Sequence, residues 1–190
     1  MTAQPKTIKF DVSTPSIIGV TALVDEPDYQ AFISGRKWSA VRTNSHAKTL
    51  YVIAHIKGRN VYLHRALLGI NDGKIFVDHR NKNGLDNRRR NLRSCTHSEN
   101  LCNRGKTVDN LSGYKGVSFC KRALNWFARI QIHGKKIHLG RFKSAKQAAI
   151  AYKKAARKYH GPFAFKPHTS KLFQNQALPK PGARKGEHHG

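Results

Sequence analysis

Acidic side chains are scarce in this chain. Among its 190 residues only 10 are Asp or Glu, against 36 Lys or Arg, so the formal net charge is +26. A protein this basic is expected to bind a polyanion, because small anionic substrates do not require so much charge. The deficit is greatest in residues 110–165, which carry 13 basic side chains and no carboxylate. A bound phosphate backbone is the usual compensation for such self-repulsion, and a solvated basic surface is the simpler alternative.

Long apolar runs and a patterned set of cysteines are also lacking. The longest apolar runs have about four or five residues, far fewer than the roughly 20 of a membrane-spanning helix, and no signal segment opens the chain. We therefore expect an intracellular protein of the cytoplasm with no membrane partner. Cys95, Cys102 and Cys120 form no C-x-x-C pair, so no structural zinc site is expected.

The first half of the chain favours short strands separated by polar loops. Four β-rich runs are expected as strands: 51–56, 61–68, 74–79 and 92–95. Asp25 is the expected N-cap of a short helix that ends at Gly35. Thr96 and Glu99 have the spacing of a capping box, which predicts a second helix with Asn100 in its first turns.

The second half predicts three strands followed by one helix. The expected strands are 113–122, 125–132 and 136–142. In the middle strand Ala128 and Ile130 alternate with polar residues such as Arg129, so one face is core and the other is polar. Ser144 is the expected cap of a helix that runs to about residue 160, and its alanines recur at the spacing of one helix face.

Four polar residues form a candidate catalytic constellation. Asp78 and His79 are adjacent on an expected strand, and Asn91 and Asn100 lie 12 and 21 residues after His79. The order strand, loop, strand, helix makes Asp78 face Asn100, and a carboxylate with an amide oxygen suits Mg²⁺ or Mn²⁺. A neutral histidine, whose unperturbed pKa is about 6.5, can take a proton from an attacking water. The alternative for Asp78 and His79 is a surface dipeptide, and for Asn91 a purely structural role.

Several motifs carry a family resemblance in this part of the chain. They are Leu63-His64-Arg65, Val77-Asp78-His79-Arg80-Asn81-Lys82-Asn83-Gly84, Asn91-Leu92-Arg93, Thr96 and Glu99-Asn100. Together they resemble the HNH endonuclease family, in particular the ββα-metal homing endonucleases of phages and group I introns. The resemblance implies that His79 is the general base, that Asp78 and Asn100 hold one metal ion, and that Asn91 steadies the site. It also implies a phosphate contact for Arg65.

The second half carries a resemblance of its own. Its motifs are Ser112-Gly113-Tyr114-Lys115-Gly116-Val117, Trp126-Phe127-Ala128-Arg129-Ile130, Leu139-Gly140-Arg141-Phe142 and Ala148-Ala149-Ile150-Ala151-Tyr152. These resemble the Apetala or ethylene-response-factor DNA-binding domain, which lays a three-stranded sheet into the major groove with a helix packed behind it. The DNA contacts implied by position are Lys115, Ser118, Gln131, Lys136 and His138. Strand alternation adds Arg129.

These observations predict an α+β protein in which a ββα-metal nuclease module precedes a three-stranded antiparallel sheet packed on one helix. The expected parts are an N-terminal segment 1–49 that belongs to the nuclease module, a nuclease domain 50–104, a linker 105–111, a DNA-binding domain 112–165 and a basic, disordered tail 166–190. Basic residues of the nuclease domain are further expected phosphate contacts: Arg80, Arg88, Arg89, Arg90 and Arg93.

The expected activity is metal-dependent hydrolysis of phosphodiester bonds in duplex DNA, with no small-molecule substrate. A monomer has one active site and is expected to nick, in a bacterial or phage-infected host and in the manner of a homing enzyme. Two other classes stay open. A non-catalytic DNA-binding regulator would keep the basic sheet without the chemistry, and an RNA-binding protein would bind RNA as well as it binds duplex DNA.

Overall fold

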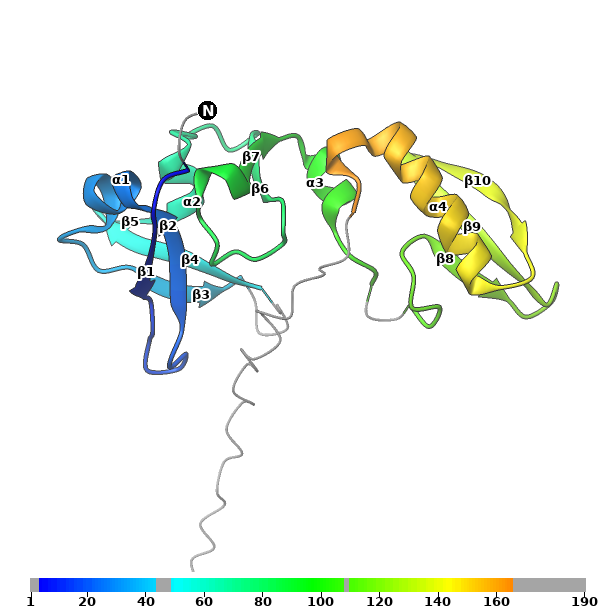
Figure 1. Cartoon of the computed structure of the whole chain (residues 1–190), viewed down its shortest axis with the longest axis horizontal. Helices are drawn as coiled ribbons and strands as arrows, with labels where there is room; N and C mark the ends of the chain where they lie inside the picture. The colour runs from blue at the N-terminus through cyan, green and yellow to red at the C-terminus, as the bar shows by residue number, and fades with distance from the viewer. Residues whose placement is uncertain (1–3, 44–48, 108–109, 166–190) are drawn as a thin grey trace, which may run out of the picture.

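The computed structural model of the chain describes residues 4–43, 49–107 and 110–165. In these residues the protein is α+β, as predicted, with small antiparallel sheets and few helices. Two regions lie side by side, with α3 (His97–Asn103) between them (Figure 1). The predicted tail 166–190 and two positions of the predicted linker lie outside the described residues.

The N-terminal region consists of two hairpins and one three-stranded sheet. Its strands are β1 (Thr7–Asp11), β2 (Thr21–Asp25), β3 (Ser39–Arg42), β4 (Leu50–Ile56), β5 (Arg59–Tyr62), β6 (Phe76–His79) and β7 (Leu92–Cys95). β1 pairs with β2, β6 pairs with β7, and β3, β4 and β5 form one sheet in that order. Lys57 and Gly58 join β4 to β5 with φ values of 49° and 75°, the left-handed pair that a two-residue hairpin turn requires.

Short helical segments connect these strands. They are α1 (Glu26–Asp28), a π-helical turn at Tyr29–Ile33, α2 (Leu63–Leu67) and a 3₁₀ turn at Arg89–Asn91. The strand predicted over 61–68 is wrong from Leu63 onward, because β5 ends at Tyr62 and α2 follows. Leu63 and Leu67 are both buried, and residues four apart share one face of a helix.

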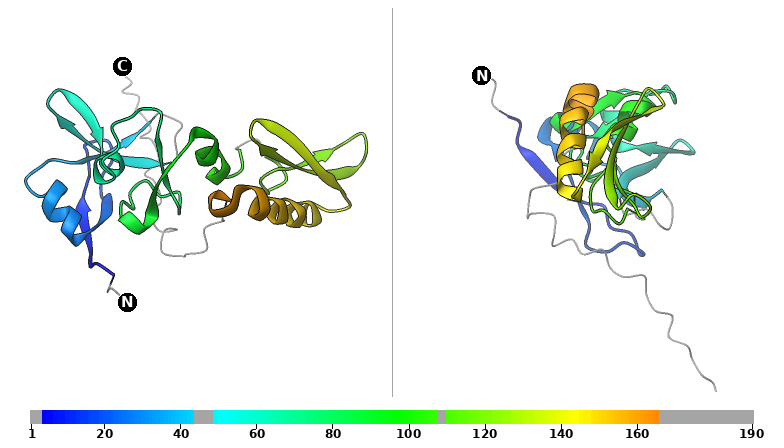
Figure 2. Two further views of the ribbon diagram at one scale, coloured as in Figure 1. Left: turned by 90° about the horizontal axis from the view of Figure 1, so that it is seen from above. Right: turned by 90° about the vertical axis from the view of Figure 1, so that its right-hand side faces the viewer.

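The C-terminal region is a three-stranded sheet with one long helix on it. It contains β8 (Val117–Cys120), β9 (Asn125–Ile132), β10 (Lys135–Phe142), α4 (Ala145–His160) and a 3₁₀ turn at Gly161–Phe163. The strand order is β10-β9-β8, and α4 covers one face of the sheet (Figure 2). Ala148, Ala155 and Ala156 are buried on that side, as the small-residue spacing of the helix predicts.

Buried apolar side chains form two clusters, one in each region. The first draws on residues from Val12 to Leu92 and therefore joins the N-terminal segment to the strands of the predicted nuclease domain. The second runs from Val117 to Ala164 and fills the space between the sheet and α4. No helix within the described ranges is long and apolar enough to cross a membrane.

Candidate functional site

Asp78 and His79 lie at the end of β6, and both residues are 5% exposed. β6 pairs with β7 so that Asp78 lies opposite Arg93 and His79 opposite Leu92. Successive residues of a strand point to opposite faces, so the two side chains have different neighbours. An acidic group and an imidazole that are both buried need polar partners, and the structure supplies them.

The two oxygens of the Asp78 carboxylate have separate partners. Oδ2 accepts hydrogen bonds from Nε of Arg93 at 2.8 Å and from Nη2 of the same residue. Oδ1 accepts a bond of 2.8 Å from Nδ2 of Asn103, which also donates to the His79 carbonyl at 3.1 Å. The carboxylate is therefore held between β7 on one side and α3 on the other.

Asn103 is a site residue that the sequence reasoning missed. The capping box of Thr96 and Glu99 begins α3 as predicted, and the predicted Asn100 is half-buried on this helix. The side chain that α3 places on Asp78 is nonetheless Asn103, which is 3% exposed. Residues three apart share one helix face, so Asn100 lies on the same side of α3 as Asn103. That spacing from Asn100 is the signal that points to Asn103 in the sequence.

The His79 ring is packed against other rings. Its centroid is 5.1 Å from that of His64 and 5.9 Å from that of Tyr51. Nε2 is 3.4 Å from Oδ1 of Asn87, an acceptor, so the tautomer that fits carries its proton on Nε2 and leaves Nδ1 as a base. Burial lowers the pKa of His79 below its usual value, against the opposing effects of Asn87 and Asp78. At neutral pH this imidazole is uncharged and able to accept a proton.

Asn91 holds the loop between β6 and β7. Its Nδ2 donates to Oδ1 of Asn81 at 3.0 Å and to the Asp86 carbonyl at 2.7 Å, while its Oδ1 accepts from the Asn81 amide at 3.1 Å. Asn81 in turn donates to the Asp86 carboxylate at 2.8 Å. Because both ends of its side-chain amide are engaged by the loop, Asn91 acts on the site through the backbone that precedes and follows it. This geometry corresponds to the structural alternative for Asn91.

Four of the arginines expected at phosphates bind the protein itself. Arg88 pairs with Asp86, Arg93 with Asp78 and Arg89 with Asp28. Arg65 donates to the backbone carbonyls of Asp72 and Ile75 at 2.7 and 2.8 Å. The guanidinium groups of Arg65, Arg88 and Arg93 are therefore engaged by internal acceptors, and their expected phosphate contacts stay predictions. The Arg89 side chain keeps 52% of its surface exposed, and Arg80 and Arg90 are exposed.

A metal ion at Asp78 fits the donor chemistry of the site only with help from amide groups. Within residues 4–43, 49–107 and 110–165, no three His, Cys, Asp or Glu side chains gather as a metal cluster. Asp78 Oδ1 accepts a hydrogen bond from Asn103, so this oxygen faces α3, the helix that also carries Asn100. One carboxylate oxygen and the amide oxygen of Asn100 are hard donors that suit Mg²⁺ or Mn²⁺ with water in the remaining positions.

The second site is the face of the β8–β10 sheet that α4 leaves uncovered. Cross-strand pairs share a face, and here Ser118 pairs with Phe127, Arg129 with His138 and Gln131 with Lys136. All but the half-buried Phe127 are exposed. The predicted contacts Ser118, Arg129, Gln131, Lys136 and His138 therefore lie together on one surface.

Phe127 and Arg141 also belong to this surface. Strand alternation predicts Phe127 on the same face as Arg129, whereas Arg141 was missed by the sequence reasoning. A β-bulge between His138 and Gly140 shifts the register, so Arg141 pairs with Phe127 and joins the open face. The guanidinium groups of Arg129 and Arg141 lie 5.7 and 5.5 Å from the Phe127 ring centroid. A glycine inside a strand is the sequence signal of such a bulge, and Gly140 has φ 133°.

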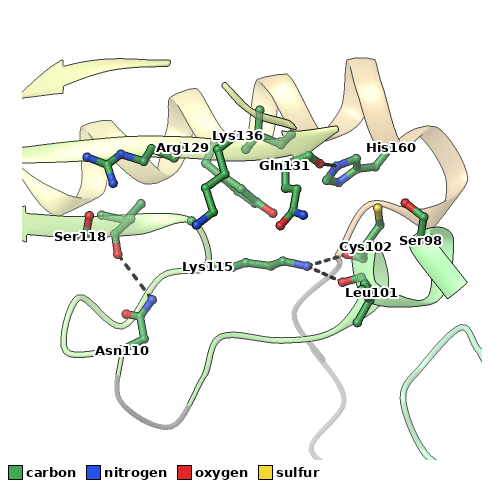
Figure 3. Close-up of a pocket in the computed structure, with 14 residues that line it drawn as sticks. Ser98, Leu101, Cys102, Asn110, Lys115, Ser118, Arg129, Gln131, Lys136 and His160 are labelled. Atoms are coloured by element: carbon green, nitrogen blue, oxygen red, sulfur yellow. Dashed lines mark hydrogen bonds between the residues drawn. The ribbon is translucent and has the colours of Figure 1, made fainter. Parts of the chain in front are cut away.

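The Lys115 ammonium is engaged by backbone carbonyls at the end of α3, and its expected DNA contact stays a prediction. Its Nζ donates to the carbonyl of Cys102 at 2.7 Å and to that of Leu101 at 3.3 Å (Figure 3). It also donates to the carbonyl of Arg104 at 2.6 Å. Burial lowers the pKa of Lys115 to about 8. A cation interacts favourably with the free carbonyls at the C-terminal end of a helix, so Lys115 attaches α3 to the C-terminal region. A pocket of about 380 Å³ lies beside it, between α3 and the open face.

No protein-family model matches this sequence, and no solved structure matches the chain.

Proposed function

We propose that the protein is a metal-dependent endonuclease that cuts duplex DNA. In this proposal β6, the loop 80–91, β7 and α3 are a ββα-metal module, and the β8–β10 sheet with α4 is a DNA-binding module of the Apetala type. The observation that carries it is the buried pair Asp78 and His79, in which a carboxylate is oriented toward α3 and an imidazole is kept neutral. Such a pair in a strongly basic chain suits hydrolysis of a polyanion.

His79 has the part of general base. Its tautomer is set by Asn87, and its low pKa keeps the ring unprotonated at neutral pH, so Nδ1 accepts the proton of the water that attacks the phosphate. Asp78 and Asn100 are the proposed holders of Mg²⁺ or Mn²⁺. The bound ion supplies Lewis-acid stabilisation of the charge that develops on the phosphate and the leaving 3′ oxygen. The products carry 5′-phosphate and 3′-hydroxyl ends.

The open face of the β8–β10 sheet is the proposed DNA contact. Exposed side chains of Arg129, Lys136 and Arg141 neutralise phosphates, and Gln131 and His138 present hydrogen-bonding groups to base edges in the major groove. Phosphate contacts position the protein, whereas base contacts specify the sequence, so this face is the source of target preference. The homing activity implied by the resemblance is part of the same proposal.

A specific observation favours a second candidate, a DNA-binding regulator without catalysis. Both oxygens of Asp78 already accept hydrogen bonds, and the Arg93 guanidinium neutralises the carboxylate. A regulator would bind DNA through the open sheet face and leave Asp78 in its ion pair.

Nicking of supercoiled plasmid separates the two candidates. We expect Mg²⁺-dependent relaxation by the wild-type chain, none in chelator, and a loss of about 10²-fold or more in His79→Ala, the size typical of a lost general base. His55→Ala removes an exposed histidine and serves as the matched control. The regulator is supported if the wild-type and His79→Ala chains bind DNA equally well and the wild type does not cleave it. The DNA tested includes the protein's own genomic locus. Nicking that survives in His79→Ala overturns the assignment of the base.

A further inference from the structure

Arg93 joins the candidate active site to the C-terminal region. Its Nε and Nη2 bond Asp78, its Nη1 donates to the Pro162 carbonyl at 2.7 Å, and its guanidinium carbon lies 3.8 Å from the centroid of the Phe163 ring. The Arg93 side chain is only 8% exposed. Each edge of the guanidinium and one of its faces therefore has a partner, and two of these partners belong to the turn that follows α4.

The turn at Gly161–Phe163 is anchored on the C-terminal module. Gly161 ends α4 with φ 52°, a left-handed conformation that L side chains rarely adopt, and Ala164 is buried in the second apolar cluster. Pro162 and Phe163 lie between these two fixed points. The end of this segment lies beside α3 (Figure 1).

The other partner of Asp78 is also fastened from the C-terminal module. Asn103 is the last residue of α3, and the carbonyls around it, those of Leu101, Cys102 and Arg104, accept hydrogen bonds from Lys115. Lys115 immediately precedes Gly116, where an added Cβ would lie 2.2 Å from the Tyr152 ring of α4. The segment that carries Lys115 is therefore packed tightly against α4.

We infer that the C-terminal module orients the Asp78 carboxylate through these two contacts, with Arg93 as the positioning residue on one side and α3 on the other. This inference rests on the proposed nuclease function. A carboxylate shared between two partners keeps its orientation only while both partners are fixed. Phe163 and Pro162 fix Arg93, which turns Oδ2 toward β7 and leaves Oδ1 directed at α3, where Asn100 and Asn103 lie.

The test is Phe163→Ala in the full chain, compared with Tyr159→Ala and Phe163→Tyr. Tyr159 is a matched control, because it is also an aromatic residue beside a cation, Lys158, in the same module. We expect Phe163→Ala to lower the nicking rate about tenfold and to raise the Mg²⁺ concentration for half-maximal rate severalfold, with plasmid binding unchanged. Phe163→Tyr keeps a ring over Arg93 and should restore both values. An unchanged rate and Mg²⁺ dependence in Phe163→Ala overturns the inference.

A double-mutant cycle measures the coupling between Phe163 and Asp78 from unfolding equilibria, so it does not depend on nuclease activity. Phe163 and Asp78 each contact Arg93, so Phe163→Ala and Asp78→Asn should be non-additive by about fivefold in the unfolding equilibrium constant. If the two substitutions are non-additive and the wild-type chain does not nick plasmid, the coupling stands and the proposed function is refuted. Additivity in a chain that nicks refutes the coupling and leaves the function standing.

Discussion

The two regions of this protein use their positive charges in opposite ways. In the N-terminal region Arg88, Arg89 and Arg93 lie against carboxylates of the same chain. The C-terminal region from 110 to 165 has no carboxylate, so its arginines and lysines have no acidic partner within their own segment. An arginine-rich run is thus a structural network where acids are near in space and an open cationic surface where they are not. In the proposed function, the difference separates a region that holds the catalytic residues from one that contacts DNA.

The strongest test of this comparison removes one arginine from each region and compares the effects on folding stability and on DNA binding. Arg88→Ala leaves the buried Asp86, 1% exposed, with less compensation for its charge, and we expect a loss of about 2 kcal/mol in the free energy of unfolding. Arg141→Ala should change this free energy by less than about 0.5 kcal/mol and weaken DNA binding severalfold. Urea unfolding and gel-shift titration measure the two effects.

Arg90→Ala is the control for Arg88→Ala, because Arg90 is exposed in the same run of three arginines. It should leave the free energy of unfolding nearly unchanged. If Arg88→Ala behaves as Arg90→Ala does, the internal role of Arg88 is refuted.

A smaller effect is expected from the salt dependence of DNA binding. Arg129→Ala and Lys136→Ala each remove a cation from the open face, so the slope of log K against log salt should decrease by roughly 0.9 for each phosphate that is no longer neutralised. Lys153→Ala removes an exposed charge from α4 on the opposite side of the sheet and should leave the slope unchanged. Equal effects from Lys153 and Lys136 would mean that binding follows net charge rather than the sheet face.

The last test concerns the acid stability of the N-terminal region and does not involve DNA. Burial lowers the pKa of His64 to about 3, whereas the unfolded chain titrates near 6.5. The unfolded state therefore binds more protons between these values, so stability is complete above the unfolded pKa and falls as pH decreases, by at most about 1.4 kcal/mol per pH unit for one group. His64→Gln should flatten this decline between pH 7.5 and 5.0 in urea unfolding. The exposed His55 gives the control, since His55→Gln should keep the wild-type slope.

Local patterns were sufficient to predict the order of elements in the C-terminal region, although the strand predicted over 113–122 is shorter, Val117–Cys120. Ser144 caps α4 by accepting from the Gln147 amide, and the predicted alternation of β9 buries Ala128 and Ile130 while Arg129 stays exposed. These features depend on residues within a few positions of one another, so a period of two or of three to four reveals them. The bulge that adds Arg141 to the open face changes only the register between β9 and β10. The periodicity of apolar residues in the sequence does not reveal such a shift.

The candidate site was predictable only in part, for a physical reason. Asp78 and His79 were singled out by their own motif, but their partners depend on distant pairing. Arg89 meets Asp28 across 61 residues, and Arg93 meets Pro162 across 69. Charge counts along the sequence cannot distinguish an arginine with a distant acid from one without, which is why Arg88 and Arg93 were expected at phosphates. The residue of α3 that reaches Asp78 is Asn103, three positions after the predicted Asn100.

The turn after α4 has a consequence for anyone who would recombine these modules. A chimera joined within the segment 105–111 keeps each apolar cluster whole, yet it removes Pro162 and Phe163 from Arg93 and Lys115 from the end of α3. If the proposed nuclease function holds, the unit that must be transferred for cleavage is therefore longer than the segment that carries Asp78 and His79. If the N-terminal region is joined to a different DNA-binding domain, that domain has to supply a backbone carbonyl and an aromatic ring that contact Arg93 as Pro162 and Phe163 do.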